Sequence, residues 1–394
     1  MALPNVSIKL TNGALGAIGD SQDNIAGLVL TGTAVGSGID LMEPKAIYSL
    51  QDAEALGILE EGTNAFAHKQ IKEFYKGYQH NTGRELSELY IILVSDLTSL
   101  EAMVDTEAVS TLLDFAQGRI RLLGLSRNPA SGYDWEHANA VDEDVIDVIP
   151  KLQTVLDTYA GTDKQSPLRG FVGGFAFVNT EYANLPDLKT QESNRVAVVA
   201  WGTDDSNVAA LGFTLGFKAS LPVQRKVSRV KNGSIRQEVF TPGTDELIMS
   251  VSEQMHNKGY ITMRTYPGRV GYYFTGEPTA TADTDDYAIL SRGCIVDKAQ
   301  RLAYDVFLEE LEDDIEVDEN GQLLAGYKAY LENRVVRRLE AEMAGAISGT
   351  PEFYILDNQN ILSDSTTRCQ LAIVPVGYQA KIEVDLGFKN PALD

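Results

Sequence analysis

Residues 259–276 read GYITMRTYPGRVGYYFTG and contain two short alternating patterns joined by one turn signal. Alternate residues of each pattern share a face: Ile261, Met263 and Thr265 in the first, and Val270, Tyr272 and Phe274 in the second. Pro267 and Gly268 are typical turn residues, so the stretch predicts two strands and a reversal of the chain. An acidic loop follows at residues 283–286, and the next segment predicts a strand that leads into a helix over Lys298–Leu311. We therefore expect a scaffold that presents helices and chain ends rather than a reaction centre.

The composition limits the classes of partner. The chain has 394 residues, which is enough for two or three domains with their own cores. Its 56 acidic and 33 basic residues give a formal net charge of −23. Nucleic-acid binding depends on clustered lysine and arginine, so this charge argues against it and against adsorption to an anionic membrane. A strongly acidic surface suits a protein that stays soluble at high concentration before it assembles.

The two cysteines, Cys294 and Cys369, lie in apolar stretches that resemble strands, and their spacing matches neither a metal site nor a disulfide framework. We interpret them as reduced core residues of a cytoplasmic protein. The first residues show no signal-peptide pattern, and no apolar run approaches the roughly 20 residues of a membrane-spanning helix. The sequence thus predicts neither a signal peptide nor membrane insertion.

The first twenty residues combine a short alternating run with a glycine-rich run. The alternating residues are Val6, Ile8 and Leu10, and the glycines are Gly13, Gly16 and Gly19. A dinucleotide-binding loop needs G-x-G-x-x-G between a strand and a helix, and this spacing does not match it. We interpret the glycines as a flexible hinge behind a terminal strand, because glycine lowers the cost of reorienting the chain.

Residues 21–205 alternate between apolar strand patterns and amphipathic helix patterns. This alternation is typical of a mixed or parallel sheet covered by helices. Ser49 and Asp52 form a capping-box pattern, and Thr63 is the expected N-cap of the next helix. Pro150 should kink or divide the helix predicted over 142–159.

A sheet of this kind binds ligands beyond the carboxyl ends of its strands. The polar loop residues expected there are Asp96, Ser126, Arg127, Asn128, Asp204 and Asp205. They could form a binding site, or they could be ordinary solvated loop residues. The glycines at 36–38 are not followed by the Lys-Ser/Thr pair of a phosphate-binding loop, so this loop predicts no cofactor.

Residues 207–219 predict a small-residue helix in which Gly212 and Gly216 lie about one turn apart. The four-residue spacing lets another backbone approach that helix closely. Further along, Asn232 and Gly233 predict a hairpin turn.

The clearest long helix is predicted over residues 323–347, where apolar residues form one stripe. Lys328, Arg334, Arg337 and Arg338 lie away from that stripe and make a basic face in an acidic chain. They could form ion pairs with glutamates of the same helix, or they could contact an acidic partner. The acidic run before this helix lacks the twelfth-position glutamate of an EF-hand, so no calcium site is predicted.

The C-terminal region contains strand patterns over 352–356, 368–376 and 381–388. The last pattern alternates cleanly, with Ile382, Val384, Leu386 and Phe388 on one side. A terminal strand this regular is either an edge of its own sheet or a strand lent to a neighbouring molecule.

Catalytic and metal-binding patterns are missing from the sequence. The four histidines lack a cysteine or carboxylate partner at ligand spacing, and no nucleophile–base pattern is present. We therefore predict no catalytic residue, no metal site and no cofactor.

The order of these features resembles contractile tail sheath proteins, which are found in myophage tails, R-type bacteriocins and contractile injection systems. The similarity lies in the Arg-Thr-aromatic-Pro-Gly-Arg turn, the tyrosine-rich strand, the acidic loop, the paired helices and the C-terminal strand pair. The expected fold is mixed α/β and α+β, with helix-covered mixed sheet domains and extended N- and C-terminal strand arms. The expected parts are an N-terminal arm over 1–20, an α/β domain over 21–205, an α+β core domain over 206–379 and a C-terminal arm over 380–394.

The resemblance also implies a function and partners. Members of that family form a helical sheath of stacked hexameric rings around an inner tube, and contraction drives the tube through a target envelope. The two arms would add strands to a sheet in neighbouring subunits, the glycine hinge would let subunits move, and the basic helix residues would be candidates for facing the tube. The implied partners are other copies of the chain, the inner tail tube protein, and baseplate and terminator proteins. Assembly would occur in the bacterial cytoplasm, and the product would be a virion tail or a contractile injection particle.

Two other functions stay open from the sequence. One is a cytoplasmic α/β enzyme whose site lies in the loops after the strands near Val94, Leu125 and Trp201. The other is a non-contractile structural protein, such as a tail tube or baseplate component. An enzyme would be a discrete monomer or small oligomer, whereas a sheath protein would form tubes that depend on both arms.

Overall fold

The computed structural model describes residues 22–135, 140–178, 181–244, 246–311 and 313–388. The chain divides into two compact units, Met1–Arg301 (unit 1) and Leu302–Asp394 (unit 2). The predicted boundary at residue 205 lies within unit 1. The four-part division is therefore finer than these two units, and it stays a prediction.

Unit 1 is built on a seven-stranded sheet with the strand order β2-β3-β1-β4-β5-β6-β7. β2 pairs antiparallel with β3, and the other strand pairs of this sheet are parallel. The strands are β1 (Ala26–Gly32), β2 (Lys45–Ile47), β3 (Leu89–Ser95), β4 (Leu122–Ser126), β5 (Arg169–Gly173), β6 (Val196–Val199) and β7 (Tyr260–Ile261). The predicted mixed sheet is confirmed.

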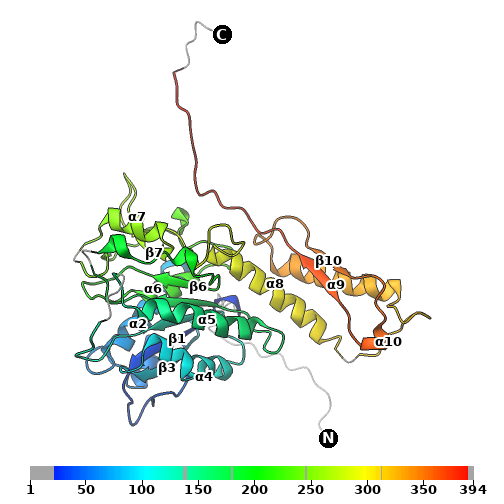
Figure 1. Ribbon diagram of the computed structural model, residues 1–394, viewed down its shortest axis with the longest axis horizontal. Helices are drawn as coiled ribbons and strands as arrows, with labels where there is room; N and C mark the ends of the chain where they lie inside the picture. The colour runs from blue at the N-terminus through cyan, green and yellow to red at the C-terminus, as the bar shows by residue number, and fades with distance from the viewer. Residues whose placement is uncertain (1–21, 136–139, 179–180, 245, 312, 389–394) are drawn as a thin grey trace, which may run out of the picture. The chain divides into compact units, whose positions relative to one another are not determined.

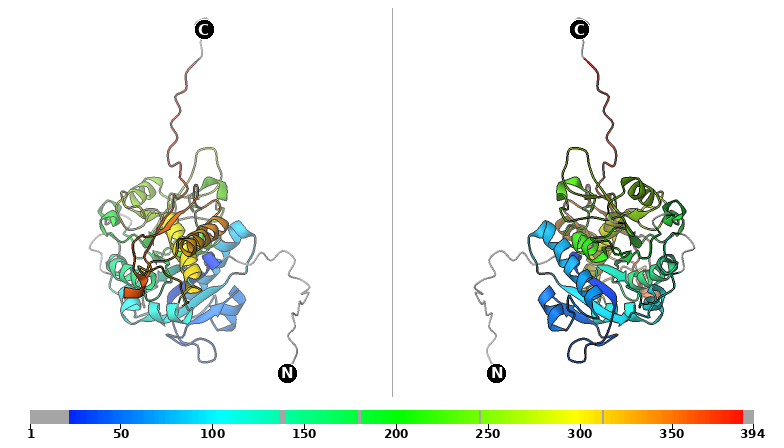
Figure 2. Two further views of the ribbon diagram at one scale, coloured as in Figure 1. Left: turned by 90° about the vertical axis from the view of Figure 1, so that its right-hand side faces the viewer. Right: turned by 90° about the vertical axis from the view of Figure 1, so that its left-hand side faces the viewer.

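Helices cover both faces of this sheet (Figures 1 and 2). One face carries α2 (Ala65–Thr82) and α6 (Leu211–Ala219), and the other carries α3 (Leu100–Asp105), α4 (Ala108–Phe115) and α5 (Asp144–Ala160). Strand β1 shows the reason: Gly27 faces Leu112 of α4, whereas Leu28 packs near Leu211 of α6. Successive strand residues point to opposite faces, so strands that are apolar throughout become buried on both sides. The remaining elements of unit 1 are α1 (Leu50–Ala55), α7 (Met249–Asn257) and the short 3-10 turns η1 (Gln22–Asn24), η2 (Tyr182–Asn184), η3 (Leu188–Thr190) and η4 (Val230–Asn232).

The two glycines of α6 allow the close approach that their spacing predicts. A Cβ atom at Gly212 would lie 1.9 Å from the carbonyl oxygen of Gln70, and one at Gly216 would lie 2.0 Å from that of Phe74. Both carbonyls belong to α2, and a Cβ atom at Gly77 of α2 would likewise lie 2.3 Å from the carbonyl oxygen of Phe213 in α6. The two backbones are therefore in contact, which side chains larger than hydrogen would prevent.

The predicted start of α1 is confirmed, and that of α2 is wrong. Ser49 and Asp52 form the complete capping box. The N-cap of α2 is Asn64 rather than Thr63, and it makes no side-chain capping bond. Its amide instead accepts a hydrogen bond from the Thr33 N–H at 2.7 Å and donates one to the Thr33 carbonyl at 3.0 Å. Asn64 thus ties the helix start to the chain that leaves β1.

Pro150 lies inside α5 without dividing it, because the helix runs unbroken over Asp144–Ala160. Proline removes one backbone donor from a helix and leaves a carbonyl unpaired one turn earlier. Pro150 is exposed, so it lies on the solvent side of the helix, where water can hydrate that carbonyl. The helix can therefore tolerate the lost bond.

The stretch 259–276 divides between two sheets. Its first residues form β7, which pairs with β6, and the next form β8 (Met263–Arg264), which pairs antiparallel with β9 (Tyr273–Phe274). Gly268 has a φ of +74° in the connecting turn, a conformation that favours glycine. The hairpin turn predicted at Asn232–Gly233 is wrong, since Asn232 ends η4 and Ile235 bridges to Tyr272.

The strand predicted before Lys298 is also wrong, because α8 spans Leu290–Leu308. The Glu277 carboxylate accepts the Ser291 N–H at 2.9 Å near the helix start. Asp297, two turns into the helix, receives two hydrogen bonds from the buried Arg169 guanidinium at 2.7 and 2.9 Å. These polar partners lie far away in the sequence, so the apolar pattern alone did not reveal the helix.

Unit 2 contains α9 (Ala325–Glu342), β10 (Glu352–Ile355), α10 (Ile361–Asp364) and β11 (Cys369–Ala372). The predicted apolar stripe of α9 is confirmed at its centre, where Leu331, Val335 and Leu339 are buried. The predicted C-terminal strand pair is confirmed as the antiparallel pair β10–β11. In the part of the chain that the structure describes, no helix is both long and apolar enough to cross a membrane.

Candidate functional site

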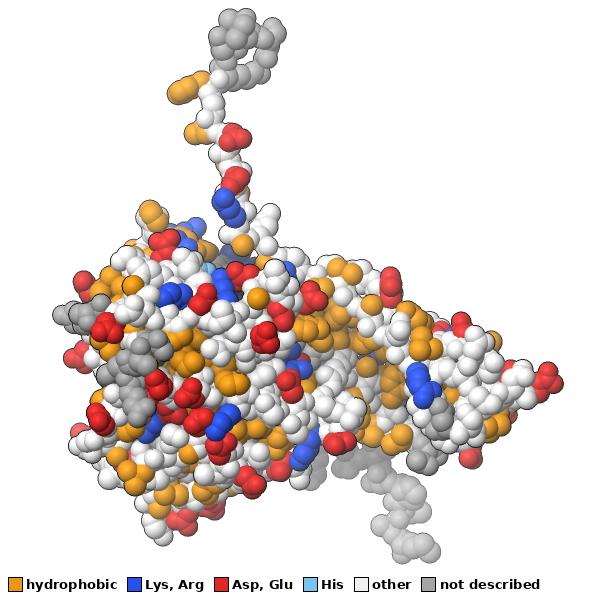
Figure 3. Space-filling model, in the orientation of Figure 1, with side chains coloured by type: hydrophobic (Ala, Val, Ile, Leu, Met, Phe, Trp, Pro, Cys, Tyr) orange, Lys and Arg blue, Asp and Glu red, His pale blue; other side chains and the backbone are white. Residues whose placement is uncertain are grey.

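The described part of the C-terminal arm, residues 380–388, has no secondary structure, and all of its residues are exposed. The exposed fractions are 74% for Ile382, 77% for Val384, 96% for Leu386 and 107% for Phe388. Figure 3 shows that hydrophobic and acidic side chains along this segment are both uncovered by the rest of the chain. Among the described residues no strand pairs with it, so it is not an edge strand of the chain's own sheets. The other predicted alternative, a strand lent to a neighbouring molecule, stays a prediction.

The strand pair β10–β11 is a sheet without neighbours within the described residues. Phe353 and Ile355 are buried, whereas Tyr354 on the opposite face is 45% exposed. The Ile355 N–H donates to the Glu332 carboxylate of α9 at 2.8 Å, which holds the pair against that helix. A two-stranded sheet offers unpaired N–H and C=O groups along both edges and is marginally stable alone. The pair is therefore able to accept further strands.

The predicted N-terminal arm and hinge lie outside the described residues. This applies to Val6, Ile8, Leu10, Gly13, Gly16 and Gly19. Their roles stay predictions.

The basic residues of α9 are mostly paired within unit 2. Lys328 forms an ion pair with Asp357, and Arg334 forms ion pairs with Glu309 and Glu310. Arg338 lies 3.5 Å from Glu342 one turn along the helix. Arg337 is exposed and has no ion pair among the described residues. Contact with a tube stays a prediction, and Arg337 is the candidate whose charge is uncompensated.

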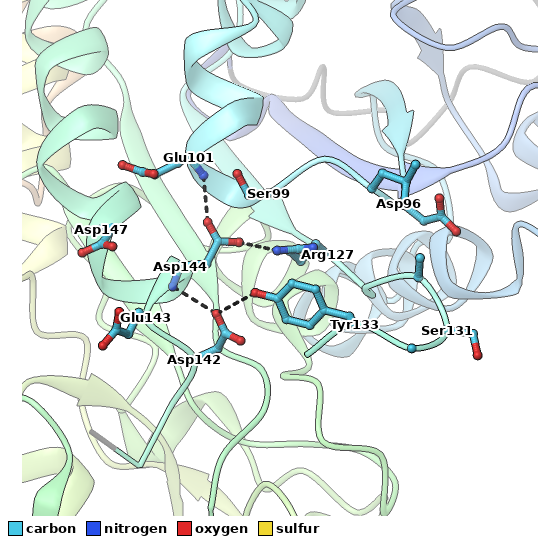
Figure 4. Close-up of a pocket in the computed structure, with 13 residues that line it drawn as sticks. Asp96, Ser99, Glu101, Arg127, Ser131, Tyr133, Asp142, Glu143, Asp144 and Asp147 are labelled. Atoms are coloured by element: carbon cyan, nitrogen blue, oxygen red, sulfur yellow. Dashed lines mark hydrogen bonds and ion pairs between the residues drawn. The ribbon is translucent and has the colours of Figure 1, made fainter. Parts of the chain in front are cut away.

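A pocket of about 420 Å³ lies beyond the carboxyl ends of β3 and β4, next to the starts of α3 and α5 (Figure 4). Arg127 is 2% exposed, and its guanidinium donates to the Asp144 carboxylate at 2.7 Å. The same guanidinium stacks over the Tyr133 ring at 4.6 Å. Asp144 also accepts the backbone N–H of Leu100 at 2.7 Å, which fixes the start of α3. Asp144 thus holds two helix starts and the buried arginine together.

Asp142 is the unusual group of this pocket. It is 1% exposed, and one of its oxygens accepts hydrogen bonds from the Asp144 N–H at 3.1 Å and the Tyr133 hydroxyl at 3.3 Å. The other oxygen is buried and has no hydrogen-bond partner. Burial raises the pKa of Asp142 above its usual value, and the charge of Asp144 adds to this effect. Sequence reasoning missed both aspartates, although the acidic triplet at 142–144 around the start of a helix could have drawn attention to them.

The predicted loop residues do not form one site. Asp96 and Arg127 line the pocket of Figure 4, whereas Asp204 lines a second pocket of about 510 Å³ beside α2. There Asp204 pairs with Lys69 at 2.6 Å. The Asn128 N–H donates to the Thr31 hydroxyl at 2.8 Å, an internal contact between two strand ends. Ser126 is buried, and Asp205 is exposed.

The second pocket contains a buried carboxyl group, that of Glu73. The Thr203 hydroxyl donates to one of its oxygens, and the other is buried without a partner. Burial raises the pKa of Glu73 to about 7. A carboxyl group of this kind is protonated in part at neutral pH, which makes it sensitive to pH.

The other titratable groups form structural contacts. His68 lies 3.1 Å from Glu54, and the His80 ring packs against Phe217. Burial raises the pKa of the Cys294 thiol, which keeps it protonated and unreactive. Across the described ranges, no group of three or more His, Cys, Asp or Glu side chains could hold a metal ion.

Three solved structures are similar to this chain over almost its whole length. The contracted helical sheath of the anti-feeding prophage is 14% identical, with a TM-score of 0.63, 99% of this chain covered and 100% of the other. The contracted sheath of the extracellular contractile injection system PVC is 13% identical, with a TM-score of 0.60 and 99% and 98% covered. The sheath tail protein of Desulfitobacterium hafniense is 8% identical, with a TM-score of 0.53 and 94% and 100% covered. The predicted resemblance to contractile sheath proteins is thereby confirmed at the level of the fold.

Sequence comparison gives a family. No curated protein matches the sequence. The model described as the DUF2586 N-terminal domain matches residues 3–277, and the model of the DUF2586 C-terminal domain matches residues 286–393. Because the two models together span nearly the entire chain, this protein belongs to the DUF2586 family and has the fold of contractile sheath proteins.

Proposed function

We propose that this protein is the subunit of a contractile sheath, which assembles into a helical sleeve around an inner tube and contracts to drive that tube through a target envelope. One observation carries the proposal: an exposed alternating arm and an unaccompanied strand pair occur in the same chain. Within the described residues the arm pairs with no strand, and the β10–β11 pair has no further strand at either edge. Two copies of the chain can satisfy both needs at once.

In the proposed contact, the C-terminal arm of one copy adds as a strand to the β10–β11 pair of the next. Backbone hydrogen bonds hold the added strand, and its period of two puts alternate residues on one face. Ile382, Val384, Leu386 and Phe388 would then extend the apolar face formed by Phe353 and Ile355. Complete burial of an apolar side chain of this size contributes about 1.5–3 kcal/mol. The four arm residues therefore supply an upper limit of about 6–12 kcal/mol per contact.

The second edge of the pair would take the N-terminal arm, with Val6, Ile8 and Leu10 as its alternating residues and Gly13, Gly16 and Gly19 as its hinge. The arms would keep subunits linked while the bodies rotate and translate. The further partners are the inner tail tube protein and baseplate and terminator proteins, and Arg337 leads the candidates for tube contact together with Lys328, Arg334 and Arg338. The role is structural and not enzymatic, with assembly in the bacterial cytoplasm and use in a virion tail or injection particle.

Negative-stain electron microscopy of the purified full chain tests the proposal. Hollow, helically striated tubes are expected from the wild type, and none from a chain that lacks residues 380–394. Leu386→Lys places a charge on the apolar side of the arm and should abolish tubes. Asp385→Lys places the same charge on the other side and should leave them intact. Compact uniform particles from the wild type at high concentration would refute the sheath function.

A further inference from the structure

The two edges of the β10–β11 pair are not equivalent. The Leu356 N–H donates to the Arg368 carbonyl at 3.0 Å, and antiparallel strands alternate between hydrogen-bonded and non-hydrogen-bonded residue pairs. The next pair, Ile355 with Cys369, is therefore of the second kind. Ile355 directs its backbone N–H and C=O groups to the outer edge of β10, and Cys369 directs its own to the outer edge of β11. The surroundings of these two residues thus show how accessible each edge is.

The edge of β10 is already occupied at Ile355. Its N–H donates to the Glu332 carboxylate of α9 at 2.8 Å, and α9 packs against β10 (Figure 1). Gln322, Leu323 and Lys328 line a cavity of about 40 Å³ with the same end of β10. This space holds a few water molecules but not a strand. An incoming strand must also displace a charged acceptor from a backbone donor, and such charge-assisted hydrogen bonds are the strong ones.

The edge of β11 is accessible. Within the part of the chain that the structure describes, β11 pairs with no strand other than β10. Cys369 and Leu371 share a face with the buried residues of β10, but they are themselves only half-buried. The apolar face of the pair is thus incompletely covered on the side of β11. A strand added beside β11 would cover it with its own apolar residues.

The charge of the C-terminal arm favours the same edge. Residues 380–388 contain two acidic residues and one basic residue. β10 begins with Glu352 and is contacted by Glu332, whereas β11 (CQLA) contains no charged residue. Like charges on neighbouring strands destabilise their pairing. An acidic arm is therefore disfavoured beside β10 and not beside β11.

We infer that the C-terminal arm of a second copy adds to the edge of β11, and that Glu332 keeps this arm from the edge of β10. The inference rests on the proposed function, which leaves the choice of edge open. The apolar side of the arm covers Cys369 and Leu371. Glu332 determines specificity by disfavouring the wrong edge rather than by binding the arm. One arm and one accessible edge in each copy give every copy a single successor.

Paired cysteines distinguish the two edges. Tyr354 and Gln370 lie opposite each other on the exposed face, so Tyr354→Cys reports on β10 and Gln370→Cys on β11. Cys369→Ala removes the native thiol of β11 from every sample. Each reporter is combined in the full chain with one cysteine on the polar side of the arm: Lys381→Cys, Glu383→Cys or Asp385→Cys. An arm on β11 lies two strand spacings, about 10 Å, from Tyr354, which exceeds the roughly 7 Å between Cα atoms that a disulfide can bridge.

Oxidised samples are compared on non-reducing gels. At least one Gln370→Cys pair should give a reducible ladder of oligomers that is about tenfold stronger than any Tyr354→Cys pair gives. Single variants should give no ladder. A ladder from the Tyr354→Cys pairs alone would place the arm on β10, and a faster-migrating monomer would place it on its own copy. Either result, or no ladder from any pair, would overturn the inference.

The role of Glu332 is tested in the same cysteine pairs. Glu332→Ala frees the Ile355 N–H and should reduce the preference for β11 over β10 by about tenfold, and Glu332→Gln, which keeps an acceptor without the charge, should reduce it less. Glu340→Ala, an exposed change in the same helix, is the matched control and should leave the preference unchanged. An unchanged preference in both Glu332 variants would overturn the role of Glu332.

The gels and electron microscopy separate the inference from the proposed function. The gels are read whether or not tubes form. Tubes without a Gln370→Cys ladder would overturn the inference and leave the sheath function standing. A Gln370→Cys ladder from a chain whose wild type forms no tubes would support the inferred contact and refute the sheath function.

Discussion

Gly216 of α6 should be one of the least replaceable residues of the fold. It lies in the middle of the helix, and a Cβ atom there would stand 2.0 Å from the carbonyl oxygen of Phe74. Real Cβ atoms keep at least about 3 Å from such an oxygen, so Gly216→Ala must push α2 and α6 apart by about 1 Å. Because the obstacle is helical backbone and not a flexible side chain, rotamer changes cannot relieve the clash.

The magnitude follows from two opposing effects. Overpacking of a close-packed interface costs about 1–3 kcal/mol, and an immovable backbone obstacle places this site at the upper end. Alanine gains up to about 1 kcal/mol over glycine from helix propensity. We therefore expect Gly216→Ala to lower the free energy of unfolding by about 2 kcal/mol.

Gly326 of α9 provides the matched control. A Cβ atom there meets no atom within 4 Å, so Gly326→Ala should keep or raise stability by up to about 1 kcal/mol. Urea unfolding followed by circular dichroism, with each unit's transition fitted separately, measures both variants. Equal effects of the two substitutions, or a stabilised Gly216→Ala, would contradict the reasoning that α2 and α6 touch through their backbones.

Three further changes test other parts of the structure. The pKa of Glu73 is raised from 4.5 to about 7, so protonation of its carboxyl group in the folded state stabilises the protein at low pH. This stability is lost as the pH rises through about 7. Glu73→Gln should therefore flatten the decline in the free energy of unfolding between about pH 5 and 8, measured by urea titrations. Asp297→Asn leaves the buried Arg169 without its anion and should lower the free energy of unfolding by about 3–5 kcal/mol. Lys164→Met breaks the exposed pair with Asp114 and should lower it by less than about 1 kcal/mol. Thermal unfolding measures both variants. Asn64→Ala removes two hydrogen bonds to the Thr33 backbone and should cost about 1–3 kcal/mol by the same measurement, whereas Thr63→Ala should cost less.

The parts of the fold that follow local rules were predictable from the sequence. Period-two and period-3.6 patterns located the strands of the main sheet, α6 and the centre of α9, because each buries its apolar residues within a few turns of chain. The glycine spacing of α6 even predicted a close backbone contact, which the structure confirms at Gly212 and Gly216. The capping box at Ser49 was similarly local.

Errors arose where a distant residue decides the local structure. The start of α8 depends on Glu277, and its Asp297 pairs with Arg169, which lies 128 residues earlier in the sequence. The Asn64 side chain forms its hydrogen bonds with the Thr33 backbone and not with its own helix. The pocket of Figure 4 follows the same rule, because Asp144 in the connection after β4 accepts the N–H of Leu100 in the connection before β4. No periodicity reports such pairs, since their spacing in the sequence is set by topology.

The C-terminal arm differs from both cases. Its alternating pattern predicts that one side is buried. The structure leaves that side exposed, with exposed fractions of 107% for Phe388 and 96% for Leu386. An alternating apolar pattern that one copy leaves exposed supports the proposed role of the arm as a strand added to another copy. What the fold of a single chain leaves unsatisfied is therefore the most informative guide to what its copies do together.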